Sequence, residues 1–314
     1  MNANRSDSEK HVPVLLQSAL DGLRIKPGGT YIDGTFGRGG HSRAILQLLG
    51  SQGRLLAIDR DPQAIAEADA ALRNDPRFEL VGGEIAELKN IAHERHLLGE
   101  VDGLLLDLGV SSPQLDEAER GFSFRADGPL DMRMDPGSGQ SAAAWLATVD
   151  EKELKQVLLK YGEEKYAGRI AAAIVAARQL NAINRTGELA QIVAAAVPQR
   201  GLRKHPATKT FQAIRIFIND EIEQLNAALK ASIELLNKGG RLCVISFHSL
   251  EDRPVKRFMR NASRESEQYR GMPDVPAEHR PPMKLVGKVI TATEAEIAAN
   301  VRSRSARLRV AERI

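Results

Sequence analysis

Four short apolar segments near the start of the chain alternate with segments of helical pattern, and this alternation most strongly limits the possible folds. The apolar segments, each expected to form a strand, are 30–33, 54–59, 78–81 and 103–107. The last one contains Leu104-Leu105-Leu106 and has the continuous apolar character of a strand buried on both faces. Strands separated by helices are typical of βαβ units, so the sequence predicts a parallel sheet.

The later part of the chain changes character twice. The alternation gives way to a helical, loop-rich pattern, and strand patterns return only at 238–246 and 306–310. We therefore expect a doubly wound α/β domain made of residues 1–118 and 216–314, interrupted by an inserted helical domain at 119–215.

A glycine-rich turn follows the first expected strand and precedes a helix. It reads Gly34-Thr-Phe-Gly-Arg-Gly-Gly40, and such a turn lets backbone amides approach a ligand. Asp59 ends the next strand, about 20 residues further on, where a carboxylate accepts hydrogen bonds from ribose hydroxyls. A tight turn followed by a helix-capping aspartate is the alternative. The pairing of turn and acid at this distance favours a cofactor that contains a nucleoside.

The spacing within the turn helps to choose that cofactor. A dinucleotide site uses GxGxxG to place a pyrophosphate at the helix N-terminus, whereas this turn reads GxxGxGG with an arginine inside it. This disfavours a rival assignment as a nicotinamide-dependent oxidoreductase. S-adenosyl-L-methionine (AdoMet) has no phosphate and needs a polar group at a further strand end, which Asp107 provides.

Composition excludes several classes of protein. Apolar residues make up 42% and charged residues 27%, with a net charge of +3, as in an ordinary globular protein. No segment approaches the roughly 18 apolar residues of a membrane helix, so we expect a cytoplasmic protein without a membrane partner.

The single cysteine, Cys243, lies in an apolar strand and is expected to be structural. Since methylation at pyrimidine carbon-5 generally needs a thiolate, an amine or another direct acceptor is favoured.

Several features indicate a nucleic-acid partner, each with a plainer alternative. Basic residues cluster at 253–260 and 302–309, which suits phosphate binding or a solvated helix face. In the segment 120–125, Phe124 and Arg125 could stack a base and hold phosphate, or the phenylalanines could anchor the insertion. His93 and His96 lack further ligands, so no metal site is expected.

Segments spread along nearly the whole chain resemble one family, the bacterial cytosine-N4 methyltransferases of 16S ribosomal RNA. The segments are HVPVLL from His11, YIDGTFGRGGHS from Tyr31, LLAIDRDPQAI from Leu55, LLLDLGVSSPQLD from Leu104, RGFSFRADGPLDMRMD from Arg120, YGEEKYAGRIA from Tyr161, HPATKTFQAIRIFIND from His205 and GGRLCVISFHSLEDRPVKRF from Gly239. The resemblance implies a Rossmann-like class I methyltransferase sheet with an inserted helical substrate-recognition domain. It further implies AdoMet-dependent methylation of a cytidine N4 amine in the decoding region of the small ribosomal subunit.

The resemblance also implies which residues form the site. Those implied to bind AdoMet are Gly37, Gly39, Gly40, His41, Asp59, Ile85, Asp107 and Gln114. The family often has an aromatic residue beside the adenine, and Ile85 departs from that pattern. Residues implied or suited to contact substrate are Phe124, Arg125, His205 and His248.

Asp107 is the expected catalytic residue. Cytosine's exocyclic amine is a poor nucleophile, and an acceptor that holds its hydrogens would restore nucleophilicity. We expect Asp107, or carbonyls in the loop 108–112, to do this. Many amino-methyltransferases have an Asp/Asn-Pro-Pro-aromatic motif here, but this chain has Asp-Leu-Gly-Val-Ser-Ser.

The sequence also gives expectations about partners. The partner is expected to be RNA and not DNA, and a homodimer is left open. The rival outside enzymes is an RNA-binding assembly factor that does not transfer methyl groups.

Overall fold

A computed structural model describes residues 13–198, 205–265, 267–269, 276 and 279–314. His11 and Val12, which begin the first family-like segment, lie outside the described residues. The chain divides into two compact units, one combining Met1–Gly109 with Gln224–Ile314 and the other formed by Val110–Glu223. The boundary expected at 215 falls inside a helix, α11 (Thr208–Ile218), so the division lies further along the chain.

The first unit is built on a single mixed sheet with the order β3-β2-β1-β4-β5-β8-β6, in which β7 also pairs with β8. Its strands are β1 (Thr30–Asp33), β2 (Arg54–Asp59), β3 (Phe78–Gly82), β4 (Val101–Asp107), β5 (Leu236–Ser246), β6 (Met283–Leu285), β7 (Ile290–Thr291) and β8 (Arg307–Arg313). The strands β1 to β5 are mutually parallel, whereas β8 is antiparallel to β5, β6 and β7. The predicted doubly wound α/β class is confirmed.

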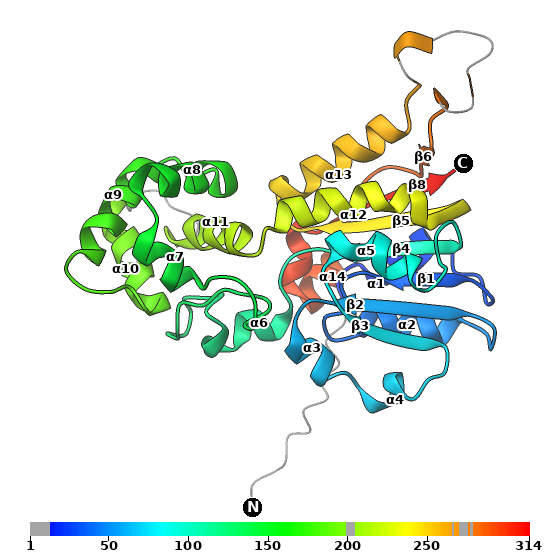
Figure 1. The fold of residues 1–314 in the computed structure, drawn as a ribbon, viewed down its shortest axis with the longest axis horizontal. Coiled ribbons are helices and arrows are strands. Elements are labelled where there is room, and N and C mark those ends of the chain that lie inside the picture. The colour runs from blue at the N-terminus through cyan, green and yellow to red at the C-terminus, as the bar shows by residue number, and fades with distance from the viewer. Residues whose placement is uncertain (1–12, 199–204, 266, 270–275, 277–278) are drawn as a thin grey trace, which may run out of the picture. The chain divides into compact units, whose positions relative to one another are not determined.

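Helices cover both faces of this sheet. They are α1 (Leu16–Leu23), α2 (Gly40–Leu48), α3 (Pro62–Ala66), α4 (Ala70–Arg73), α5 (Leu88–His93), α12 (Glu221–Leu235), α13 (Ser249–Ala262) and α14 (Glu294–Ala299). On one face α5 and α12 lie side by side (Figure 1), and an ion pair joins Lys89 to Glu234. The opposite face packs against α1 and α2.

The two faces have separate cores because side chains alternate along each strand. Leu104 and Leu106 of β4 pack with apolar side chains of α5, α12 and α13. Their neighbour Leu105 packs on the other face, with Tyr31 of β1 and with side chains of α1 and α2. A sheet buried on both faces explains why its central strands have continuous apolar sequences.

Two local features concern single helices of this unit. Leu48 of α2 is exposed, whereas Ile45 and Leu46 of the same helix are buried in the core. His93 and His96 do not share a helix: α5 ends at His93, and His96 has a left-handed backbone with φ of 56°.

The second unit is helical. Its elements are α6 (Ser112–Asp116), the short helix Ala118–Arg120, α7 (Ala142–Thr148), α8 (Glu151–Gly162), α9 (Ala167–Arg178), α10 (Thr186–Ala196) and α11. Its core is formed by apolar side chains of α7 to α11, together with Leu130 and Met132 from the preceding loop.

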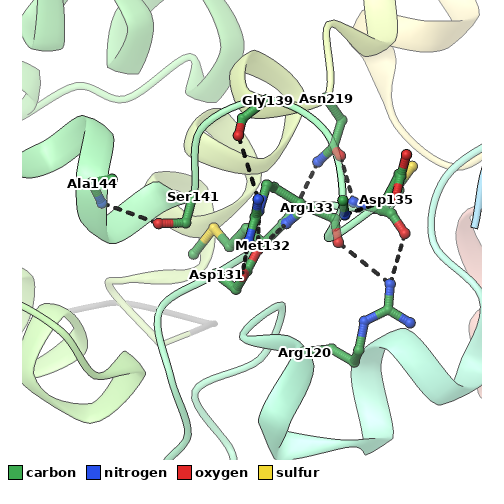
Figure 2. Close-up of polar contacts among 11 residues, drawn as sticks. Arg120, Asp131, Met132, Arg133, Asp135, Gly139, Ser141, Ala144 and Asn219 are labelled. Carbon is green, nitrogen blue, oxygen red and sulfur yellow. Dashed lines mark hydrogen bonds and ion pairs between the residues drawn. The ribbon is translucent and has the colours of Figure 1, made fainter.

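Polar contacts fix that long loop in the second unit (Figure 2). The Asn219 side chain donates to the Met132 carbonyl and accepts from the Met134 amide, both at 2.7 Å. The buried Arg120 guanidinium donates to the Met134 carbonyl at 2.9 Å, and Asp131 accepts two hydrogen bonds from the Arg133 guanidinium and one from the Arg133 amide. Arg120 therefore has a structural role, and the loop owes its shape to side chains because it lacks regular backbone pairing.

Candidate active site

The glycine turn after β1 adopts backbone angles and contacts that favour glycine. Gly37 and Gly39 have φ of 55° and 69°, in the left-handed region that other residues rarely adopt. A Cβ on Gly39 would lie 2.7 Å from the Phe36 ring, and one on Gly40 would lie 2.4 Å from Cγ of Pro13. The turn thus brings its backbone close to neighbouring groups before α2 begins.

Asp59 holds the turn from the end of β2. Its Oδ2 accepts a hydrogen bond from the Gly37 amide at 2.7 Å, and its Oδ1 accepts one from the Asp61 amide at 2.9 Å. Burial raises the pKa of Asp59. The helix cap of α3 is Asp61, which accepts from the Gln63 amide at 3.0 Å, so Asp59 is not the capping residue.

Asp107 and His41 approach each other at the carboxyl end of β4. Oδ2 of Asp107 lies 3.6 Å from Nδ1 of His41. Burial lowers the pKa of His41 to about 4, so the imidazole is neutral at physiological pH and the contact is not an ion pair. Oδ1 of Asp107 and Nε2 of His41 are buried, and neither has a hydrogen-bond partner among the residues that the structure describes. Buried polar atoms are rarely left unpaired, so both are available to a ligand.

Two further acids, which the sequence analysis did not single out, belong to the same cluster. Asp33 ends β1 and is buried; it accepts from the Ser42 hydroxyl at 2.7 Å and from the Thr35 amide at 3.2 Å. Burial raises the pKa of Asp33 to about 6. Burial and the nearby carboxylates of Asp33 and Glu251 together raise the pKa of Asp107 well above its usual range. Asp33 could have been predicted as a site residue from its position at the end of a strand. Nothing in the sequence indicated that Glu251 lies near Asp107.

His248 stands at the N-terminus of α13 and contacts Glu251. Its Nε2 lies 3.0 Å from Oε1 of Glu251, while Oε2 of Glu251 accepts from the Phe247 amide at 2.7 Å. Glu251 is buried and also influences Asp107 electrostatically, so this end of α13 belongs to the same edge of the sheet.

Ile85 also lies at this edge. It begins a short helix, Ile85–Glu87, and packs partly buried against the core. Its Cγ2 is 3.6 Å from the position that a Cβ on Gly34 would occupy, so its methyl groups adjoin the glycine turn.

The remaining predicted residues belong to the second unit. Gln114 is buried on α6 and accepts from the Ser111 amide at 2.9 Å. The Phe124 ring lies 4.6 Å from the His205 ring and 4.9 Å from the Phe211 ring, centroid to centroid. Arg125 is exposed beside them. Phe124 therefore has an anchoring contact in its own unit, and its binding role stays a prediction.

The charge of the cluster in the first unit indicates the kind of ligand it can hold. Asp33, Asp59 and Asp107 are brought together at one edge, and among the described residues no lysine or arginine side chain contacts them. Buried acids without a cationic partner favour a cationic ligand and disfavour a pyrophosphate. AdoMet, which carries a sulfonium and an ammonium, fits this requirement. Within the described part of the chain, no group of His, Cys, Asp and Glu side chains is arranged to hold a metal ion.

This acidic edge of a doubly wound sheet, next to a glycine turn, agrees with the class of protein to which the chain belongs, the AdoMet-dependent methyltransferases of class I. The chain belongs to the MraW methylase family, whose model matches residues 8–314. It is accordingly an AdoMet-dependent methyltransferase of ribosomal RNA.

Solved structures with low sequence identity also resemble the chain. A provisionally assigned rRNA methylase from Clostridium thermocellum is 15% identical, with 96% of this chain and 97% of that chain covered and a TM-score of 0.44. An rRNA methylase from Streptococcus thermophilus is 11% identical, with 95% of each chain covered and a TM-score of 0.42. A provisionally assigned methyltransferase from Streptococcus mutans, in complex with SAH, is 12% identical, with 96% and 99% covered and a TM-score of 0.42.

Proposed function

We propose that the chain transfers the methyl group of AdoMet to the exocyclic N4 amine of a cytidine in 16S rRNA, in the decoding region of the small ribosomal subunit. The main support for this proposal is the buried Oδ1 of Asp107 at the end of β4, which has no hydrogen-bond partner within the described part of the chain. An amine hydrogen is a suitable partner for that oxygen. The specific RNA and base rest on the family-like segments of the sequence.

Different residues of the site are assigned to different parts of the cofactor. When bound, AdoMet supplies a methyl group on a sulfonium that is already a good leaving group. Asp59 accepts hydrogen bonds from the ribose, and Ile85 offers an apolar face to the adenine. Gly39, Gly40 and His41 adjoin the methionine end. His41 is neutral, so it adds no charge that would repel a cation.

Asp107 acts on the incoming amine. Its carboxylate accepts an amine hydrogen, which orients the nitrogen lone pair toward the methyl carbon and stabilises the positive charge that develops on nitrogen. Its raised pKa makes the ionised carboxylate a stronger proton acceptor than an ordinary aspartate. Proton transfer to Asp107 would follow methyl transfer.

The single cysteine supports an amine target over ring carbon-5. Cys243 is fully buried in β5, and burial raises the pKa of its thiol to about 12. Carbon-5 methylation needs a thiolate that adds to the ring, and this thiol neither ionises nor reaches a substrate. A direct attack by the amine needs no such group.

Substrate contacts are assigned to both units. His248 lies at the acidic edge of the sheet, where the target base must enter. Phe124, Arg125 and His205 combine aromatic rings with an exposed guanidinium, which suits a splayed single-stranded nucleotide. Gln114, on α6 of the second unit, is assigned to the cofactor by the family-like segments of the sequence alone. No described helix is long and apolar enough to cross a bilayer, and we place the reaction in the cytoplasm.

The deciding experiment uses small ribosomal subunits from cells that lack the protein. They are incubated with purified protein and methyl-labelled AdoMet, and the labelled nucleoside is identified by mass spectrometry after digestion. Label in N4-methylcytidine, abolished by Asp59→Ala, is the expected result. Label in another nucleoside would overturn the substrate assignment. Absence of both label and AdoMet binding would favour the assembly factor.

A further inference from the structure

The exposed surface of α13 carries a stripe of basic side chains. Lys256, Arg257 and Arg260 are exposed, and Arg253 and Arg264 extend the series at its two ends. Arg264 follows the end of the helix at Ala262. At about 100° per residue, Arg253, Lys256, Arg257 and Arg260 lie within an arc of about 100° on one side of the helix. From Arg253 to Arg260 the stripe runs for about 10 Å along the axis.

The central cations of this stripe are not neutralised. Lys256, Arg257 and Arg260 form no ion pair with any residue that the structure describes, whereas other basic residues of the same unit do. The two acids of α13 do not lie on this face. Glu251 is buried beside His248, and Asp252 is buried against Arg309, with Nε–Oδ1 at 2.7 Å. The stripe is therefore uniformly positive.

The second basic cluster of the sequence is different. Arg307 and Arg309 of β8 both contact Asp252, so part of its charge is used within the fold. This contrast separates the two clusters, which looked alike in the sequence.

The opposite face of α13 explains why this amphipathic helix is not a membrane anchor. Val255 and Met259 are buried in the core of the first unit, so the apolar face is already occupied. Only the basic face is exposed to a partner. The helix also starts beside His248 and Glu251, so the stripe leads away from the candidate active site.

We infer that Lys256, Arg257 and Arg260 bind the phosphates of the RNA strand that flanks the target nucleotide. The inference rests on the proposed function in taking RNA as the substrate. Three cations on one side of a rigid helix neutralise successive phosphates without reading the sequence, and they fix the direction in which the strand leaves the active site. This gives the first unit its own RNA-binding surface, separate from the inserted helical unit.

The test compares two triple variants. The first, Lys256→Gln/Arg257→Gln/Arg260→Gln, removes the centre of the stripe. The matched control, Arg24→Gln/Arg54→Gln/Lys238→Gln, removes the same charge from exposed positions near the amino ends of β1, β2 and β5. Binding to a fluorescent, cytidine-rich single-stranded RNA is titrated at several salt concentrations, and AdoMet affinity is measured to show that each variant is folded.

The expected result is specific to the stripe. Each lost phosphate contact lowers the slope of log affinity against log salt by about 0.7, so the first variant should lose about 2 from the slope and bind at least about tenfold more weakly. The control should match the wild type. An unchanged slope, an equal loss in the control, or a loss confined to binding of anionic phospholipid vesicles would each overturn the inference.

The proposed function and this inference fail in different ways. Suppose that the wild-type protein binds RNA, that the stripe variant loses the expected slope, and that no cytidine N4 is labelled. The proposal of cytidine methylation is then wrong, and the inference that the stripe binds RNA is supported. Suppose instead that the wild-type protein methylates the subunit and the stripe variant keeps both the salt dependence of RNA affinity and the KM for the subunit. The inference that the stripe binds RNA is then wrong, and the methylation proposal is supported. A role of these cations limited to stabilising α13 would lower Tm and leave the slope unchanged, which also overturns the inference.

Discussion

The carboxylate of Asp59 accepts a hydrogen bond from the Gly37 amide at 2.7 Å, so the end of β2 and the glycine turn after β1 form one continuous structure. The acid that is assigned to the ribose therefore also fixes the turn that is assigned to the methionine end. Under the proposed assignment, a single side chain would support both ends of the cofactor.

Replacing Asp59 should therefore strongly impair cofactor binding. Asp59→Ala removes the acceptor for two ribose hydroxyls, each worth about 1.5–3 kcal/mol, and should weaken AdoMet binding about a hundredfold or more in calorimetric titration. Asp59→Asn keeps one acceptor and should lose less. Asp69→Ala, which removes an exposed acid of the same unit, serves as the control. An unchanged affinity in Asp59→Ala would remove Asp59 from the cofactor site.

Gly39 should be intolerant of a side chain for two separable reasons. Gly39→Ala combines a positive φ with a Cβ 2.7 Å from the Phe36 ring, and should cost about 2–4 kcal/mol of unfolding free energy. Gly99→Ala has a similar φ of 74° but nothing within 4 Å, and should cost only about 1 kcal/mol. Denaturant titration measures both. Equal costs would show that the close packing at Gly39 is relieved by movement of the ring.

Asp107→Asn should impair chemistry more than binding. Loss of the carboxylate should lower kcat by about 10²–10³ and weaken AdoMet binding by a smaller factor, because the acid acts directly on the amine and is only one of three acids near the cofactor. Single-turnover methylation of the small subunit measures the effect. Asp102→Asn changes an acid at the other end of the same strand, where Lys26 pairs with it, and should leave kcat unchanged. Lost AdoMet binding with normal chemistry in Asp107→Asn would contradict the catalytic role.

Asp33 should make stability depend on pH. Its pKa is about 6 in the folded protein, against the ordinary aspartate value of 3.8, so its contribution to stability is fully present below about pH 4 and is lost as pH rises through about 6. Asp33→Asn cannot ionise. The unfolding free energy of the wild type minus that of the variant should therefore fall by about 2–3 kcal/mol between pH 4 and pH 7. A difference that does not change with pH would show that Asp33 titrates normally.

Cys243→Ala tests the target atom. The variant leaves a small cavity in a buried strand, which should cost about 1 kcal/mol of stability, while methyl transfer continues at the wild-type rate. The rate is measured with labelled AdoMet, and thermal unfolding reports the stability. Complete loss of transfer in a variant that is folded and binds AdoMet would indicate a thiolate mechanism and a carbon-5 target.

Local sequence predicted the parallel strands well. The expected segments 30–33 and 54–59 coincide with β1 and β2, because short apolar runs bounded by turn residues have few other ways to be buried. The order of the strands did not follow from the sequence. For example, β8 lies beside β5 and runs antiparallel to it. This arrangement depends on pairing between distant segments, which local sequence patterns do not predict.

The same division applies to the site. The sequence by itself determined the glycine turn and the acids that end β2 and β4, because spacing along βαβ units places strand ends at one edge of a parallel sheet. Only the tertiary structure brought Glu251 near Asp107 and paired Arg307 and Arg309 with Asp252. Among the residues it describes, it also leaves the site acids without a cationic partner and Lys256 and Arg257 without an ion pair. The physical reason is that burial and charge pairing depend on neighbours in space, and residues more than a hundred positions apart become neighbours only when the chain folds.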